Sequence, residues 1–213
     1  MKIIACVFED ISKNSIISML KRQIRAPEEI LVCGKEDVRD RCAGDTVVYM
    51  GDMGCESEME SVLRMAFKRW SSMDSSERDV CFLLVGDCVL RKDAVDYLRK
   101  TYVPGRISTF SSENPYFMRD THVRRLDPSG CVLISAKFMR SNEGRQNDLF
   151  RWISTCPGSK GVALGYWCAK QKIPALHIGA TVVYCEPNNR VDMTLIDSTG
   201  DYISNMESDI EMN

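Results

Sequence analysis

The stretch Val80-Cys-Phe-Leu-Leu-Val-Gly-Asp87 decides the fold, because it combines a buried strand with a turn that ends it. Its first six residues are all apolar, which is typical of a strand covered on both faces. Gly86 leaves room for close approach to the backbone, and Asp87 is expected to project from the carboxyl end of the strand. A helical pattern follows at about residues 91–100, so the segment predicts one strand-turn-helix unit of an α/β sheet.

The same alternation continues on both sides of this stretch. Further strands are expected at residues 2–8, 29–33, 46–50, 131–136 and 181–185, and further helices at residues 12–24, 55–70 and 162–170. The helix at 55–70 carries apolar residues on one face at helical spacing. We therefore predict an α/β fold with a mixed, mostly parallel central sheet of about six strands and helices on both faces. One domain is expected over residues 1–190, with residues 191–213 as an acidic tail or linker.

Composition excludes several classes of protein. The 213 residues include 28 Lys and Arg and 30 Asp and Glu, a net charge of -2, which argues against a general nucleic-acid binder. No apolar run approaches about 18 residues, so no membrane span is expected. The ten cysteines show no C-x-x-C spacing, and five fall in expected strands, where a reduced cysteine packs as a small apolar residue. This pattern favours a reducing, cytoplasmic location.

Ligands of such sheets bind beyond the carboxyl ends of the strands. The residues to consider there are Glu9 and Asp10, residues 34–37, residues 51–54 and residues 86–88. Asp87 is either a simple turn residue or a ligand for a hard divalent cation that bridges phosphates. The irregular stretch 104–127 carries Arg119, His122, Arg124 and Arg125, which would form either an anion-facing patch or a solvated loop.

Several of these segments resemble glycosyltransferases of the GT-A fold, especially the family-2-like group. Val85-Gly86-Asp87 lies where that family has its D-x-D motif, with the last Asp preserved and the first one missing. The strand at 2–8 with the following Glu9-Asp10 resembles the family's opening strand and base-contacting loop. Residues 27–37 resemble its second strand, residues 51–54 its glycine loop, and residues 159–177 a later helix in which Lys160-Gly161 replaces an acidic pair.

The resemblance implies a metal-dependent glycosyltransferase that moves a sugar from a nucleoside-diphosphate sugar, expected to be UDP-linked, to a glycan or glycoprotein acceptor. Residues 1–103 would form the nucleotide-binding half and residues 104–190 the acceptor half. The family includes viral enzymes that glycosylate capsid proteins, and such an enzyme would act in the host cytoplasm. The implied donor contacts are Phe8, Glu9, Asp10, Gly34, Lys35, Asp37, Arg64, Val85, Gly86 and Asp87.

Mn²⁺, or alternatively Mg²⁺, is the implied cofactor, with Asp87 and the late His177 as its ligands; a structural histidine is the plainer interpretation of His177. An inverting enzyme needs a carboxylate base, for which Asp127, Glu143 and Asp148 all stay open, and a retaining mechanism is the alternative if none reaches the acceptor. Trp152, Tyr166 and Trp167 either stack on a sugar or belong to the core.

Two other functions stay open. A sugar nucleotidyltransferase shares the sheet, although it normally has a basic, glycine-rich loop after the first strand, where this chain has Glu9-Asp10-Ile11-Ser12. A noncatalytic nucleotide- or glycan-binding module is compatible with the missing acidic pair. Partners beyond donor and acceptor would be further domains of a longer chain.

Overall fold

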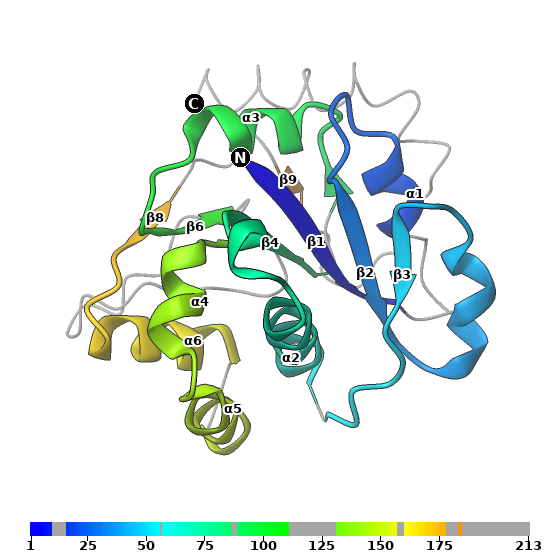
Figure 1. The fold of residues 1–213 in the computed structure, drawn as a ribbon. Coiled ribbons are helices and arrows are strands. Elements are labelled where there is room, and N and C mark those ends of the chain that lie inside the picture. The colour runs from blue at the N-terminus through cyan, green and yellow to red at the C-terminus, as the bar shows by residue number, and fades with distance from the viewer. Residues whose placement is uncertain are drawn as a thin grey trace.

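A computed structural model describes residues 1–9, 16–55, 57–86, 89–110, 131–156, 160–177 and 183–184. Its centre is a seven-stranded sheet with the order β3-β2-β1-β4-β7-β6-β8, and β5 pairs with β9 in a separate two-stranded sheet (Figure 1). The strands are β1 (Lys2–Phe8), β2 (Glu29–Cys33), β3 (Val47–Tyr49), β4 (Val80–Val85), β5 (Val89–Leu90), β6 (Ile107–Phe110), β7 (Cys131–Ile134), β8 (Ala175–His177) and β9 (Val183–Tyr184).

The central sheet is mixed and mostly parallel, as predicted. The parallel pairs are β1 with β2, β2 with β3, β1 with β4 and β6 with β8, whereas β7 runs antiparallel to both of its neighbours, β4 and β6. Strands from residues 1–103 occupy one side of the sheet and strands from residues 104–190 the other. The division at residue 103 is therefore a division within one continuous sheet.

Helices cover both faces of this sheet, which confirms the predicted α/β class (Figure 1). Alternate residues of β1 point to opposite faces: Ile4 and Cys6 join the core beneath one set of helices, and Ile3, Ala5 and Val7 the core beneath the other. The first set is α2 (Glu58–Ser71), α4 (Ala136–Asn142), α5 (Gln146–Thr155) and α6 (Lys160–Lys170); the second is α1 (Ile16–Lys21) and α3 (Ala94–Thr101). Two 3₁₀ helices, η1 (Glu36–Cys42) and η2 (Ser75–Glu77), lie in connections.

The structure differs from the sequence-based expectation in the second half of the chain. Strands β6 and β8 extend the central sheet beyond the predicted six strands, and the segment expected at 181–185 contributes β9 to the separate two-stranded sheet instead. The strand expected at 131–136 ends at Ile134, because the Ser135 side chain accepts a hydrogen bond from the Phe138 N–H and starts α4. The acidic segment 191–213 lies outside the described residues.

The strand cysteines pack in the core as expected. Cys6, Cys33, Cys81 and Cys131 are buried, and within the described ranges no disulfide joins any cysteines. Burial raises the pKa of Cys33 to about 12 and that of Cys81 to about 11, so both thiols stay protonated near neutral pH. Cys185 lies outside the described residues. None of the helices in the described part of the chain combines the length and apolar character that a bilayer crossing requires.

Candidate functional site

The strand order reverses between β1 and β4. From β1 the chain moves outward through β2 to β3 and then returns to β4 on the other side of β1. The register pairs Val7 with Val85, so Phe8 and Gly86 follow side by side at the carboxyl ends of these two strands. In open α/β sheets, ligands bind in the crevice outside the carboxyl ends of strands where the order reverses. This edge is therefore the candidate functional site.

Glu9 and Gly34 close one side of this edge. The Glu9 N–H donates to the Cys33 carbonyl at 2.9 Å, which extends the β1–β2 ladder by one residue. A Cβ on Gly34 would lie 2.5 Å from the Glu9 carbonyl oxygen, so only glycine fits there without a backbone shift. The Gly34 carbonyl accepts from the Tyr49 hydroxyl at 3.0 Å, which adds the end of β3 to the same edge. Backbone packing therefore requires glycine at position 34.

A glycine loop connects β3 to α2, as the sequence predicts. Gly51 and Gly54 have φ angles of 85° and 63°, a region that other residues adopt rarely. The Asp52 carboxylate accepts from the Gly54 N–H at 2.8 Å and fixes the turn. Ser57 then caps α2 by accepting from the Glu60 N–H. The loop therefore delivers the amino-terminal end of α2 to the carboxyl edge of the sheet.

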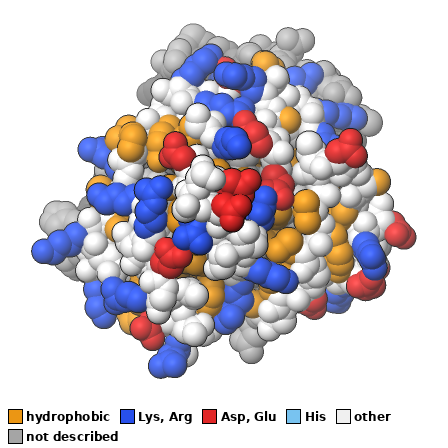
Figure 2. Space-filling model, viewed as in Figure 1, with side chains coloured by type: hydrophobic (Ala, Val, Ile, Leu, Met, Phe, Trp, Pro, Cys, Tyr) orange, Lys and Arg blue, Asp and Glu red, His pale blue; other side chains and the backbone are white. Residues whose placement is uncertain are grey.

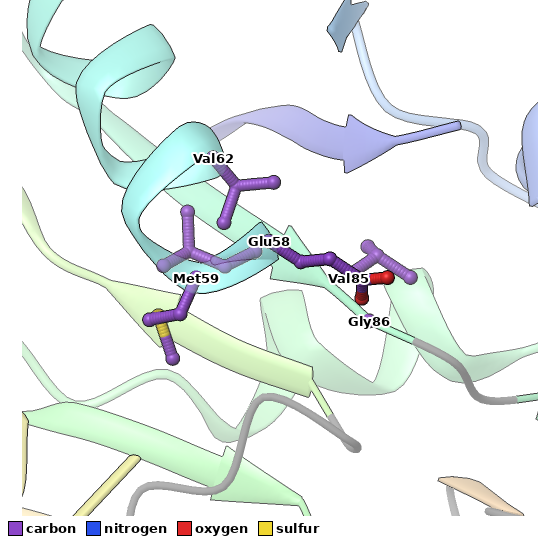
Figure 3. A pocket seen from close by; sticks show the side chains of 6 residues that line it. Glu58, Met59, Val62, Val85 and Gly86 are labelled. Atoms are coloured by element: carbon purple, nitrogen blue, oxygen red, sulfur yellow. The ribbon is translucent and has the colours of Figure 1, made fainter. Parts of the chain in front are cut away.

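A small pocket lies where the first turn of α2 meets the end of β4 (Figure 3). It is lined by Glu58, Met59, Val62, Leu84, Val85 and Gly86. The Glu58 side chain extends toward Val85 and Gly86 (Figure 3), so a carboxylate lies next to the residue that precedes Asp87. Sequence reasoning identified Val85 and Gly86 but missed Glu58. The sequence did contain a signal for Glu58, because it lies at the start of an expected helix, and the helix of a β-α-β unit begins at the edge where the preceding strand ends.

Arg64 lies on α2 with its guanidinium engaged by neighbouring side chains. It pairs with the nearly buried Glu60 carboxylate at 2.8 Å and lies 4.4 Å from the centroid of the Phe150 ring on α5. Lys35 and Asp37 are exposed at the start of η1, next to Gly34. Among the predicted donor contacts, Phe8, Glu9, Gly34, Lys35, Val85 and Gly86 lie at the carboxyl ends of β1, β2 and β4. Asp10 and Asp87 lie outside the described residues.

The second half of the chain reaches the same edge. Phe110 at the end of β6 pairs with Cys131 at the start of β7, which in turn pairs with Val85. His177 ends β8 in parallel register with Thr109 and so comes to this edge as well. Because neighbouring strands lie about 4.8 Å apart, three strand steps separate the backbones of β8 and β4 by roughly 14 Å. Asp127, His122 and the arginines 119, 124 and 125 lie outside the described residues.

Glu143 and Asp148 do not come to this edge. The Glu143 carboxylate accepts from the Arg78 guanidinium at 2.9 Å, and Arg78 precedes β4 at its amino end. The six residues of β4 separate that end from Val85 by roughly 20 Å. Asp148 is exposed in the first turn of α5, beside Arg145, which bonds to Gln171 just before β8. Glu143 and Asp148 were expected in the acceptor half, beside the site, but both lie near the amino ends of the strands.

The tryptophans differ in exposure. Trp167 is buried, with its indole N–H donating to the buried Asn142 side chain at 2.8 Å and the Arg145 guanidinium over its ring, so it belongs to the core. Trp152 is 38% exposed, and its indole N–H donates to the Ala163 carbonyl on α6. Tyr166 is half-buried. Of Trp152, Tyr166 and Trp167, only Trp167 is fully explained by packing in the core.

Charge is mixed over the surface that Figure 2 shows, with Lys and Arg side chains interspersed among Asp and Glu. This distribution agrees with the near-neutral composition and offers no broad basic surface on that face. Within the described ranges, no three His, Cys, Asp or Glu side chains gather to form a metal-binding cluster. Binding of an anionic ligand at the edge would therefore depend on backbone groups, on individual side chains or on a bound cation.

No protein-family model matches the chain, and no curated protein matches its sequence. Among solved structures, the chain is similar to 4-diphosphocytidyl-2C-methyl-D-erythritol synthase from Anaerococcus prevotii. The sequence identity is 11% and the TM-score 0.45, over 95% of this chain and 96% of that one. This degree of similarity decides neither activity nor substrate. The observed strand order shows an α/β fold with a candidate binding edge where the order reverses.

Proposed function

We propose that this chain is a nucleotide-dependent transferase whose donor, a nucleoside-diphosphate sugar, binds at the carboxyl ends of β1, β2 and β4. One observation carries the proposal: the reversal of strand order between β1 and β4, at which Phe8, Glu9 and Gly86 come together. The glycosyltransferase resemblance of the same segments agrees with this position. The acceptor would be a glycan or glycoprotein, approached from the side of β6 and β8.

The described residues suggest how the donor is held. Glu9 follows β1, and Lys35 and Asp37 are exposed at the start of η1, on the β2 side of the edge, where the proposed nucleoside would lie. Gly86 has no side chain to obstruct a diphosphate that approaches the end of β4. Phe8 is partly exposed at the end of β1 and packs against the core beneath α2, so its ring would form a wall of the site.

This proposal includes a divalent cation at the end of β4. Glu58 places a carboxylate beside Gly86, and Asp87 is the next residue in the chain. Oxygen ligands suit Mg²⁺ and Mn²⁺. When bound, such an ion neutralises the diphosphate and stabilises the leaving group. In this proposal Asp87 is the principal ligand, and His177 contributes from the other side of the edge.

In this proposal Asp127 is the base, if the enzyme inverts configuration. Glu143 is paired with Arg78 near the amino end of β4, and Asp148 lies in that same region, so neither is retained here. Arg64 keeps a role in donor binding only if its guanidinium leaves Glu60 and Phe150. A retaining mechanism without an enzyme base is the alternative for the same donor site.

The binding test uses isothermal titration with UDP, in Mn²⁺ and in chelator. Asp87→Ala should abolish the cation-dependent part of the affinity. Asp79→Ala is the matched control, because Asp79 is exposed immediately before β4, at the opposite end of the same strand. UDP binding that is equal in Mn²⁺ and chelator, and equal in Asp87→Ala, would remove the metal role.

The activity test separates three functions by ³¹P NMR. A glycosyltransferase releases a nucleoside diphosphate from the sugar donor, and a sugar nucleotidyltransferase releases pyrophosphate from a nucleoside triphosphate and a sugar phosphate. A noncatalytic module binds nucleotide and releases neither. Pyrophosphate release alone would replace the glycosyltransferase proposal with its nucleotidyltransferase alternative.

A further inference from the structure

An exposed isoleucine follows α1. Ile24 is 70% exposed, whereas the other exposed large apolar side chains of the described residues lie between 36% and 43%. It stands in the run Lys21-Arg22-Gln23-Ile24-Arg25, in which the flanking residues are basic or polar. A single exposed apolar side chain is common at protein surfaces, so the surroundings of Ile24 decide whether it has a role.

The backbone around Ile24 is bonded to α3 and to the residues just before it. The Ile24 N–H donates to the Lys92 carbonyl at 2.8 Å, and the side chain of the buried Gln23 accepts from the Val95 N–H at 3.2 Å. The carbonyls of the two residues after Ile24 accept from the Arg99 guanidinium, at 3.0 and 3.2 Å. Hydrogen bonds on both sides of Ile24 therefore hold its backbone, and the exposed side chain is presented from a fixed segment.

Cationic side chains lie beside this segment in excess over carboxylates. Arg25 and Lys100 both bind the Asp96 carboxylate, at 3.3 and 2.6 Å, and their side chains are 66% and 71% exposed. Lys92, whose carbonyl accepts from Ile24, has an exposed side chain as well. Three exposed cations thus accompany one carboxylate, in a chain whose net charge is -2.

The neighbouring carboxylates do not cancel this excess. Asp93 pairs with Arg91, and Glu28 pairs with Arg99, so each of them is already balanced by an arginine. Tyr97 on α3 adds a second exposed side chain that is largely apolar, at 36%. The surface that these observations define, the α1–α3 corner, consists of Ile24, Arg25, Lys92, Tyr97 and Lys100.

We propose that the α1–α3 corner docks on a membrane surface that carries anionic lipids. Exposed Lys and Arg side chains are attracted to anionic headgroups. An aliphatic side chain such as Ile24 can enter the boundary between headgroups and acyl chains, and a tyrosine ring suits the headgroup level. A nucleic acid or an acidic protein would use the cations alone, whereas lipid uses the cations and Ile24 together. Docking at this corner is independent of the proposed donor site.

Co-sedimentation of the whole chain with vesicles tests this surface. Vesicles of phosphatidylcholine alone are compared with vesicles in which half of the lipid is phosphatidylserine. Ile24→Ser removes the aliphatic side chain, and Lys92→Gln removes one exposed charge. The matched controls are Val48→Ser, at an exposed valine on β3, and Lys68→Gln, at an exposed lysine on α2, which covers the other face of the sheet. Urea unfolding checks that each variant keeps the stability of the parent.

We expect binding to the vesicles that contain phosphatidylserine and not to phosphatidylcholine alone, and weaker binding as the salt concentration rises. Lys92→Gln should weaken binding about fivefold and Ile24→Ser about tenfold, whereas Val48→Ser and Lys68→Gln should leave it unchanged. Equal binding to both kinds of vesicle, no binding to either, or equal losses in the control variants would overturn the proposal. A loss confined to Lys92→Gln would overturn it as well, because it would indicate an acidic macromolecule as the partner in place of lipid.

Discussion

Gly34→Ala should disturb the candidate site through a contact that is fixed by the backbone. The new Cβ would lie 2.5 Å from the Glu9 carbonyl oxygen and 3.0 Å from a methyl group of Val38, whereas ordinary contacts begin at 3.4 Å. Glu9 cannot retreat freely, because its N–H is bonded to the Cys33 carbonyl at 2.9 Å. The ends of β1 and β2 must therefore separate by about 1 Å at the edge that we assign to the donor.

The expected loss of stability follows from two opposing effects. Inserting a methyl group into a packed region costs about 1–3 kcal/mol. Replacing glycine with alanine restricts the unfolded chain, which returns about 0.4–1 kcal/mol. The net destabilisation is about 1–2 kcal/mol, which for a chain of this length lowers the Tm by roughly 2–8 °C. Urea unfolding followed by tryptophan fluorescence measures the free energy directly.

A second glycine separates a local effect on the site from general destabilisation. Gly144 has a φ of 80°, no atom lies within 4 Å of the place that a Cβ would occupy there, and the residue adjoins Glu143, away from the candidate edge. Gly144→Ala should cost about 1 kcal/mol through backbone strain alone and leave UDP affinity unchanged. Gly34→Ala should lower both stability and UDP affinity. A Gly34→Ala protein as stable as the parent would refute the packing argument.

Three further predictions concern the core, acid stability and thiol reactivity. Asn142→Ala should lower the free energy of unfolding by about 1–3 kcal/mol in urea titrations, because it leaves the buried Trp167 indole N–H without its acceptor, while the exposed Asn147→Ala should not. Burial alone would raise the pKa of Glu28, but the Ile3 N–H and the Arg99 guanidinium hold that pKa below its usual 4.5. The folded protein is therefore stabilised by the ionised Glu28 carboxylate above pH 4.5, and it loses this contribution as the pH falls through the lower pKa of the folded state. Glu28→Gln should flatten the fall of Tm below pH 4.5, and an unchanged slope would contradict this. Iodoacetamide should label half-buried Cys55 faster than buried Cys33 in the native protein, as followed by mass spectrometry. UDP with Mn²⁺ should slow the labelling of Cys55. Equal labelling rates at Cys55 and Cys33 would contradict the burial of Cys33.

The first half of the fold was predictable because its strands are long apolar runs. β1, β2 and β4 are buried on both faces, so their sequences show an uninterrupted apolar signal, and α2 shows clear helical spacing. β6 and β8 have four and three residues, too few for periodicity to be recognised. The boundary at Ser135 was missed because four apolar residues precede it and an alanine follows, while a single capping side chain turns the chain from strand to helix.

The candidate site, like the fold, was predictable only in part. Sequence patterns locate residues that directly follow a strand, such as Glu9, Gly34 and Gly86, because position along the chain is enough to place them. Glu58 was missed because it reaches the edge from the start of a helix, where an acidic residue is equally well explained by the helix dipole. Glu143 and Asp148 could not be placed from the sequence, because the helices beside them, α4 and α5, were not expected from its patterns.

The antiparallel strand β7 explains why the second half of the site resists prediction from the sequence. In a purely parallel sheet, every strand would contribute the residues that follow it. Because β7 is reversed, its first residue, Cys131, lies at the edge between the last residues of its two neighbours, Val85 and Phe110. This half of the edge therefore combines the start of one strand with the ends of two others, so being next after a strand does not identify all of its residues. In the proposed transferase, the donor side is assembled from consecutive β-α units, whereas the acceptor side depends on one reversed strand, so substitutions near Cys131 should alter acceptor choice before they alter nucleotide binding.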